Sequence, residues 1–224
     1  MAGTFGAQPM TRPVVLVFLK HPTPGRVKTR LAAAVGPERA AEIYREMVGT
    51  VLAAVRPLRD RADVIGYFDG AAAEAFADWQ PLADDWLPQP AGGLGERLEA
   101  GFALAHARGG PVLAVGTDAP EIDATLLGEA IDVLRMNDAV FGPAHDGGYY
   151  LVGTARRLPG FFDGVRWSSE HTLADHLERC RSAGWSVGLL PPLHDIDTAD
   201  DWLAYQSRAS RRGHQSTTDP SSSS

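Results

Sequence analysis

The sequence predicts one α/β domain: a three-layer α/β/α arrangement with a mostly parallel, mixed sheet between helices. Two observations support this. Short apolar, β-branched runs of strand length recur along the chain, and segments with apolar residues at helical spacing separate them. A chain of 224 residues also suits one hydrophobic core better than two. Alternating strands and helices are typical of an open sheet covered on both faces.

Six strands are expected from the apolar runs. The first reads Val-Val-Leu-Val-Phe-Leu without a polar residue, as in a strand buried on both faces. The fifth is expected to return antiparallel along the sheet. The expected strands are 14–19, 64–68, 112–115, 139–141, 149–152 and 187–190.

Helices are expected between these strands. Pro37 is placed for the first turn of a helix whose apolar positions recur at helical spacing as far as Val55. A last helix is expected to begin near Thr198, with Asp201 as its capping partner. The other expected helices are 71–79, 94–107, 123–134 and 170–183, and residues 20–36 are expected to form a loop.

The composition defines the domain limits and excludes several classes of protein. We expect a flexible segment 1–12, a single domain 13–206 and a disordered, serine-rich tail 207–224. A net charge of -7 argues against nucleic-acid binding. No apolar run approaches the roughly 20 residues that cross a bilayer, so no membrane association is expected. With no secretory signal at the start, the expected location is the cytoplasm.

A basic loop follows the first strand. The five basic residues before Glu38 include Lys20, Arg26, Lys28 and Arg30, and no acidic residue precedes Glu38. In an acidic protein, such a cluster is better explained by a polyanionic ligand such as a di- or triphosphate than by a solvated surface loop, which stays the alternative. Gly25 permits a tight turn here. The spacing fits neither a Walker A loop nor a GxGxxG fingerprint.

Acidic residues follow two later strands. Asp118 lies in the turn Gly-Thr-Asp-Ala-Pro after strand 112–115, where ligands bind open α/β sheets, and its carboxylate suits a hard cation such as magnesium. The alternative is a cap for the next helix, which Asp123 could provide instead. Asp195 and Asp197 point the same way on an extended stretch and could share a metal site with Asp118.

Two glycine-rich segments complete the candidate site. Gly147 and Gly148 follow Asp146 and allow the backbone to approach a ligand closely. The segment from Gln89 to Arg97 begins a helix whose free N–H groups favour an anion or the polar edge of a base, although a plain loop-to-helix turn explains it about equally well.

Five ordered motifs together resemble a known bacterial family. They are Lys28-Thr29-Arg30-Leu31, Gly116-Thr117-Asp118-Ala119-Pro120, Gly142-Pro143-Ala144-His145-Asp146-Gly147-Gly148-Tyr149-Tyr150, Trp167-Ser168 and Asp195-Ile196-Asp197-Thr198. This set resembles the radical-SAM/selenodomain-associated transferases of the nucleotide-diphospho-sugar transferase superfamily, and the resemblance implies the glycosyltransferase-A fold. The basic loop is similar to that of phospholactate guanylyltransferases, and the last motif is similar to the ending of molybdenum-cofactor nucleotidyltransferases.

The resemblance implies that Lys20, Lys28 and Arg30 hold phosphates and that Asp118 and Asp197 bind magnesium. The other candidate roles come from the residue patterns described above. Lys28, Arg30 and Asp118 would be catalytic, and Asp118, Asp197 and Asp195 would bind Mg²⁺ or Mn²⁺. The expected nucleotide-binding residues are Lys20, Gly25, Arg26, Lys28, Arg30, Gln89, Gly95, Arg97 and Thr117. The expected substrate-binding residues are Asp146, Gly147, Gly148, Trp167 and Ser168.

The leading hypothesis is a metal-dependent nucleotidyltransferase that moves a nucleoside monophosphate from an NTP to a small phosphorylated acceptor. One alternative is a glycosyltransferase that uses an NDP-sugar. Glycosyltransferases of this fold usually carry an Asp-x-Asp motif, and Gly116 stands at its first position here. A second alternative is a non-catalytic nucleotide-binding protein, against which the retained acids and basic loop argue.

Overall fold

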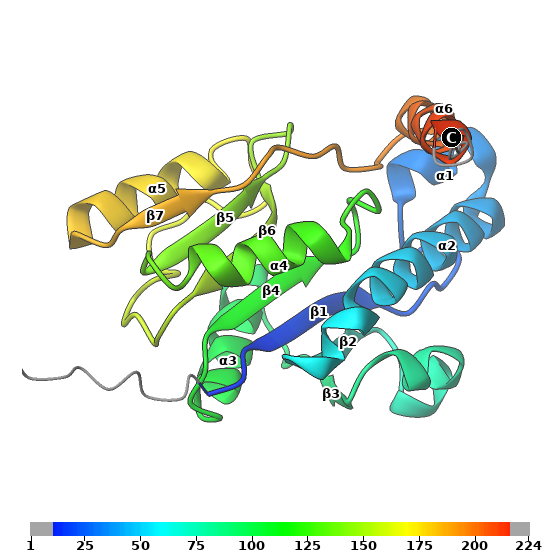
Figure 1. Ribbon diagram of the computed structural model, residues 1–224. Helices are drawn as coiled ribbons and strands as arrows, with labels where there is room; N and C mark the ends of the chain where they lie inside the picture. Colours follow the sequence, from blue (N-terminus) through cyan, green and yellow to red (C-terminus); the bar gives the residue numbers. More distant parts are fainter. Residues whose placement is uncertain (1–10, 216–224) are drawn as a thin grey trace, which may run out of the picture.

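A single seven-stranded sheet organises the protein (Figure 1). The structure is a computed structural model that describes residues 11–215, with side chains to Arg211. The strand order is β3-β2-β1-β4-β6-β5-β7. The strands are β1 (Val14–Lys20), β2 (Asp63–Asp69), β3 (Asp85–Pro88), β4 (Val112–Gly116), β5 (Ala139–Pro143), β6 (Tyr149–Thr154) and β7 (Val187–Leu189).

The sheet is mixed because one strand runs against the others. β1 lies between β2 and β4 and is parallel to both. β6 is antiparallel to its neighbours β4 and β5, while β7 is parallel to β5. This arrangement confirms the α/β fold class and the antiparallel return of the fifth expected strand.

Helices cover both faces of the sheet (Figure 1). They are α1 (Thr29–Val35), α2 (Pro37–Val55), α3 (Leu94–His106), α4 (Ala124–Val133), α5 (Thr172–Ala183) and α6 (Ala199–Gln215), with 3-10 turns η1 (Arg56–Asp60) and η2 (Ala73–Leu82). Side chains of α2 and α4 pack on one face, and side chains of α3 and α5 pack on the other.

Alternation along β1 explains its unbroken apolar sequence. Val15, Val17 and Leu19 face the α2 and α4 layer, whereas Val14 and Leu16 face the α3 layer. Successive strand residues point to opposite faces, so a strand covered on both sides needs an apolar residue at every position. The strand thereby holds Lys20, at its carboxyl end, in a fixed position beside the helices.

A third apolar cluster fixes the C-terminal helix beside α1 and α2. Ile196 and Trp202 are buried against residues of those helices: Leu31, Ala40, Ile43 and Met47. Thr198 and Asp201 form the expected cap at the start of α6, because the Thr198 N–H donates to the Asp201 carboxylate at 2.8 Å. The packing of α6 therefore places the segment around Asp197 next to the loop after β1.

The chain ends differ from the sequence-based expectation. Helix α6 continues past Ser207 to Gln215, where disorder was expected, because Arg208 Nε donates to Glu121 at 3.1 Å and ties the helix to the turn after β4. Arg12 also lies in ordered structure, since its guanidinium donates to Asp63 at 2.9 Å. The rest of the two predicted flexible ends, 1–10 and 216–224, lies outside the described residues.

Besides the 3-10 turn η1, two short elements were not expected. The predicted loop 20–36 contains α1, and β3 forms an edge strand that pairs in parallel with β2. Both are short, and β3 carries the polar and proline residues that are typical of a protected sheet edge. Within residues 11–215, no helix has the length and apolar character needed to cross a membrane.

Candidate functional site

A cleft of about 700 Å³ opens at the carboxyl ends of β1 and β4. This is the edge at which open α/β sheets bind ligands. Most of the residues predicted from the basic loop and the acidic motifs line it: Lys20, Arg26, Lys28, Arg30, Gln89, Arg97, Thr117, Asp118, Ser168 and Asp197. Lys28, Asp118 and Asp197 thus share one cleft, whereas Asp195, a predicted metal ligand, is not among the described residues that line it.

Lys28 lies at the centre of the charged part of the cleft. Its side chain is only 6% exposed, and its Nζ lies 2.5 Å from Asp118 Oδ1 and 3.1 Å from Asp197 Oδ1. Its backbone is left-handed, with φ 46°, a conformation that costs a non-glycine residue about 1–2 kcal/mol. Strain of this kind persists only where the surroundings hold the residue in place, and it is frequent at functional sites.

The two ion pairs determine the protonation of Lys28. Burial by itself lowers the pKa of the ammonium, but the charge and hydrogen bond of Asp118, followed by those of Asp197, outweigh it and raise the pKa above its ordinary value. The lysine is therefore a fixed positive charge between two carboxylates.

The acidic residues come from two separate segments that meet at the cleft. The backbone N–H of Ile196 donates to the carbonyl oxygen of Asp118 at 2.9 Å. Asp195 is partly buried, and its Oδ1 has no hydrogen-bond partner among the described residues. Burial, followed by the charges of Asp118 and Asp146, raises the pKa of Asp195 to about 7.

The donor set fits a hard divalent cation that brings further ligands with it. Asp118 and Asp197 offer carboxylate oxygens, and Asp195 adds a buried oxygen without a partner beside them. No group of three or more His, Cys, Asp or Glu side chains within the described ranges is arranged to hold a metal by itself. Magnesium is commonly held by one or two protein carboxylates together with water and substrate phosphates, and such a ligand set agrees with this site.

The basic residues of the loop after β1 differ in exposure. Arg30 is 71% exposed, and its guanidinium donates to Asp197 at 3.3 Å. Lys20 and Arg26 are exposed and line the cleft. Gly25 has φ 74° and makes the tight turn that was predicted, but it is not among the described residues that line the cleft. The loop thus presents several cationic side chains to one cavity.

Gln89 and Arg97 form a hydrogen-bonded unit at the other end of the cleft. Arg97 Nη1 lies 2.5 Å from Asp69 Oδ2 and donates to Gln89 Oε1 at 3.2 Å. Gln89 Nε2 in turn donates to the Tyr67 carbonyl at 2.6 Å. Each of these side chains already has partners within the protein, so they form a rigid wall of the cleft.

Gly95 and Trp167 contact each other, and neither is among the described residues that line the cleft. A Cβ atom at Gly95 would lie 2.5 Å from the indole Nε1 of Trp167. The absence of a side chain at Gly95 therefore allows Trp167 to pack on the start of α3. Ser168 does line the cleft and has a left-handed backbone with φ 56°.

The turn at 146–148 lies beside the acidic residues and outside the lining of the cleft, as far as the described residues show. Asp146 Oδ1 accepts a hydrogen bond of 2.8 Å from the Gly148 N–H. Gly147 has φ 90°, and a Cβ there would lie 2.2 Å from the Glu170 carbonyl oxygen. The glycines thus let this turn pack closely on the backbone before α5.

Tyr44 on α2 is a cleft residue that the sequence analysis did not identify. Its buried hydroxyl accepts a hydrogen bond of 3.1 Å from the Lys20 N–H and lies 3.0 Å from Thr117 Oγ1. Burial, followed by the charge of Asp118, raises the pKa of Tyr44 to about 12. In the sequence it occupies an ordinary core position of an amphipathic helix, so no local signal separates it from the apolar residues around it.

The chain matches one protein family and several solved structures. Residues 52–169 match a family described as an uncharacterized protein conserved in bacteria (DUF2064). A solved structure from Desulfovibrio desulfuricans G20, described as a candidate nucleotide-diphospho-sugar transferase, is 34% identical with a TM-score of 0.80, and the alignment covers 89% of this chain and 88% of that one. A search of curated proteins gave no significant match.

Two more distant structures share the fold. One is the Rv0371c protein of Mycobacterium tuberculosis H37Rv in complex with manganese, 19% identical with a TM-score of 0.52 over 88% of this chain and 98% of that one. The other is CMP:2-keto-3-deoxy-manno-octonic acid synthetase in complex with CTP, 12% identical with a TM-score of 0.56 over 90% of this chain and 99% of that one. The similarity to the D. desulfuricans structure confirms the nucleotide-diphospho-sugar transferase fold.

Proposed function

Since the chain belongs to the DUF2064 family of bacterial proteins, we propose that it is a metal-dependent transferase acting on nucleotides, and specifically a nucleotidyltransferase. It would move a nucleoside monophosphate from an NTP to a small phosphorylated acceptor. The observation that carries this proposal is the meeting of the basic loop with Asp118 and Asp197 in one cleft.

The basic side chains would hold the triphosphate. Lys20, Arg26 and Arg30 line the cleft and present cationic groups to it, and guanidinium groups bind phosphate with two parallel hydrogen bonds. Gln89 and Arg97 form the wall at the other end of the cleft, where the nucleoside would lie against Phe18 and Leu98. Such contacts would orient the α-phosphorus for attack by the acceptor.

Asp118 and Asp197, with Asp195 beside them, would hold Mg²⁺ or Mn²⁺. Such an ion would supply positive charge that neutralises the negative charge developing on the phosphates. The M. tuberculosis protein, which shares the fold, has been solved with manganese, which agrees with a divalent metal in this proposal.

The side chains of the protein would position the reactants and stabilise the charge that develops during transfer. An acceptor phosphate oxygen would form a bond to the α-phosphorus while the bond from the α-phosphorus to the bridging oxygen breaks, and pyrophosphate leaves with that electron pair. Lys28 and Arg30 are placed to stabilise this charge. No protein nucleophile is needed, so the catalytic groups are those that bind and orient.

The five sequence motifs support a finer assignment. Under this assignment the chain would be a cytoplasmic enzyme of the radical-SAM/selenodomain-associated transferases, related to the phospholactate guanylyltransferases. The acceptor side would include Ser168 in the cleft, with Trp167 and the turn 146–148 behind it.

A glycosyltransferase that uses an NDP-sugar is the second candidate. The 34% identical structure from D. desulfuricans favours it through its description as a candidate nucleotide-diphospho-sugar transferase. Under this alternative the same cations would hold a diphosphate, and Asp146 would lie near the sugar.

A thermal-shift panel of NTPs and NDP-sugars, each with and without Mg²⁺ or Mn²⁺, tests the proposal. A ligand at about 100 times its dissociation constant adds about 2.7 kcal/mol, which moves the midpoint of a domain of this size by several degrees. We expect metal-dependent stabilisation by one NTP, followed by pyrophosphate release with the right acceptor. Stabilisation by an NDP-sugar alone would favour glycosyl transfer, and nucleotide binding without turnover would favour a non-catalytic binding protein.

A further inference from the structure

Lys28 occupies the position that a cation would take between Asp118 and Asp197. Its Nζ is within 3.1 Å of an oxygen of each carboxylate. We propose that Lys28 determines which form of the metal the site accepts: it excludes the free divalent ion and admits the ion as a complex with a polyphosphate. This inference rests on the proposed function, because it concerns the same metal and phosphate groups.

The position of Lys28 is built into the fold. Its side chain is 6% exposed, and its left-handed backbone directs the chain from the loop into α1. Both carboxylate segments are also fixed, since the Ile196 N–H binds the Asp118 carbonyl and Asp201 caps the start of α6. The ammonium is therefore held between two anchored carboxylates and is not a mobile surface group.

Because of the charges in the cleft, a metal ion can displace the Lys28 ammonium from the two carboxylates only when an anion is also bound. A divalent ion bound to Asp118 and Asp197 would lie next to the ammonium, and Arg30 already shares Asp197. Lys28 would then lose both of its partners while remaining in a cleft that is also lined by Lys20 and Arg26. Like charges at such distances repel strongly where water is partly excluded. A polyphosphate in the cleft supplies new partners for the ammonium and removes this cost.

The small number of metal ligands that the protein offers also indicates that the metal binds together with a polyphosphate. Within the described residues, no group of three or more candidate side chains can hold a metal alone. Phosphate oxygens would complete the coordination of the ion and would at the same time receive the displaced Lys28. The metal and the polyphosphate should therefore bind with positive coupling.

Lys20 provides the matched control. It lines the same cleft and carries the same charge, yet it forms no ion pair within 4 Å among the described residues. Lys28→Met and Lys20→Met each remove one cation from the cleft and leave an unbranched side chain that is one heavy atom shorter. A difference between the Mn²⁺ affinities of the two variants therefore measures direct competition between Lys28 and the metal for the carboxylates. The general positive potential of the cleft changes in both variants.

The experiment measures free Mn²⁺ by electron paramagnetic resonance during titration of the protein. Each protein is titrated with Mn²⁺ alone and with Mn²⁺ complexed to inorganic tripolyphosphate, which carries no base and so needs no knowledge of the nucleotide. Wild type, Lys28→Met, Lys28→Gln, Lys20→Met and Asp118→Asn are compared, with circular dichroism to confirm that each is folded.

We expect wild type to bind Mn²⁺ alone weakly and to bind the complex about tenfold or more tightly. Lys20→Met should bind Mn²⁺ alone as weakly as wild type, and its affinity for the complex should fall because Lys20 would hold a phosphate. Lys28→Met and Lys28→Gln should bind Mn²⁺ alone more tightly than wild type by a similar factor and should show weaker coupling, because only the phosphate ligands of the ion then contribute to it. Equal affinity of wild type and both Lys28 variants for Mn²⁺ alone, with binding lost in Asp118→Asn, would overturn this inference and leave the proposed function standing. Failure of every protein to bind either Mn²⁺ or the complex would overturn both. The wild-type coupling is a test in its own right: if Mn²⁺ alone binds wild type as tightly as the complex does, the inference is wrong whatever the variants do.

Discussion

The backbone N–H of Ile196 donates a 2.9 Å hydrogen bond to the carbonyl oxygen of Asp118. This contact joins the turn after β4 to the segment before α6, so carboxylates that are far apart in sequence meet at one end of the sheet. Ile196 is itself buried in the cluster that packs α6 against α1 and α2. The acidic half of the site is thus positioned by the hydrophobic core.

Asp118→Asn should abolish metal-dependent turnover while leaving the fold nearly intact. The amide keeps the shape of the side chain, which is 53% exposed, but loses the charge that binds a cation. We expect a loss of about a hundredfold or more in metal affinity or activity, since even the indirect partners of a metal can be worth that much. Nucleotide-dependent pyrophosphate release with Mn²⁺ is the measurement.

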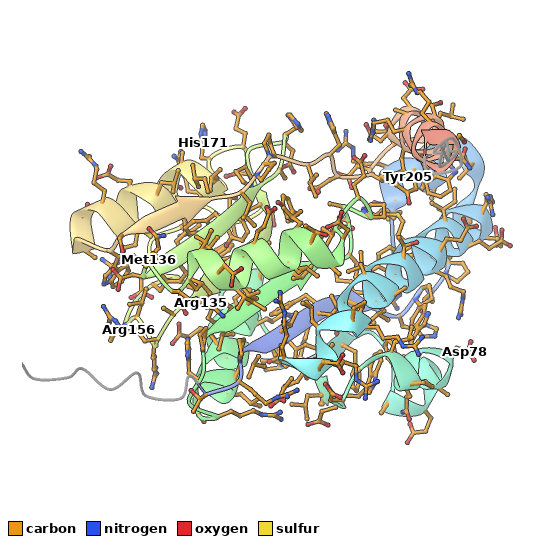
Figure 2. All side chains as sticks on the ribbon, viewed as in Figure 1. Asp78, Arg135, Met136, Arg156, His171 and Tyr205 are labelled. Carbon is orange, nitrogen blue, oxygen red and sulfur yellow. The ribbon has the colours of Figure 1, made fainter. Side chains whose placement is uncertain are left out.

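Asp78→Asn is the control for this change. Asp78 belongs to η2, lies at the edge of the molecule in Figure 2 and is 83% exposed, with Arg45 at 3.4 Å. It should behave as wild type in the same assay. Full activity in Asp118→Asn would show that the metal assignment is wrong.

Tyr44→Phe should destabilise the protein more than Tyr150→Phe. The Tyr44 hydroxyl contacts both the Lys20 N–H and Thr117, whereas the Tyr150 hydroxyl makes one hydrogen bond of 3.0 Å to the Pro191 carbonyl. A buried polar group left without a partner costs about 1–3 kcal/mol, and Tyr44→Phe leaves two such groups. Urea unfolding of the two variants is the measurement, and equal midpoints would contradict the bridging role of Tyr44.

The sequence was sufficient for six of the seven strands and for the charged end of the cleft. Strands such as β1 are buried on both faces, so nearly every residue in them is apolar. Helix α2 has apolar residues at helical spacing along its whole length. Ligands bind at the carboxyl ends of such strands, so basic and acidic residues after β1 and β4 could be assigned to one site before the structure was known.

The features that the sequence did not predict depend on contacts between segments that are far apart in the chain. Tyr44 has the burial pattern of a core residue, and only its partners at the ends of β1 and β4 reveal its position in the site. Gly95 looked like an anion-binding glycine, but its neighbour in space is Trp167. The last turns of α6 carry a polar sequence, and their contact with Glu121 could not be read from it.

Gly95→Ala should destabilise the protein because a Cβ atom would overlap the Trp167 ring. The overlap at 2.5 Å involves a bulky ring packed against α3, so either the helix or the indole must shift, at a cost of about 1–3 kcal/mol. Thermal unfolding and tryptophan fluorescence would report the change.

Gly49→Ala is the matched control on another helix. A Cβ at Gly49 would lie 3.8 Å from Trp79 Nε1, which is ordinary contact, so alanine should stabilise α2 by about 0.5–1 kcal/mol. Opposite signs for the two variants are expected, and a stabilising effect at Gly95 would mean that Trp167 does not pack there.

The buried His176 should make stability depend on pH in the mildly acidic range. Its ring is fully buried, its Nε2 lies 2.8 Å from the Phe161 carbonyl oxygen, and burial lowers its pKa from 6.5 to about 4. The unfolded chain therefore takes up a proton at a higher pH than the folded chain. The stability that neutral His176 contributes is complete above about pH 6.5 and is lost as the pH falls from there through about 4, a loss on the order of 3 kcal/mol.

Urea unfolding between pH 7.5 and pH 4.5 measures this dependence. His176→Gln should be less stable than wild type at pH 7.5, because it loses packing among Phe141 and Phe161, but its stability should fall less steeply toward acid. His171→Gln removes an exposed imidazole just before the same helix, labelled in Figure 2, and controls for the loss of a histidine as such. If His176→Gln and wild type lose stability in parallel over this range, then carboxylates elsewhere, and not His176, govern the acid sensitivity of the fold.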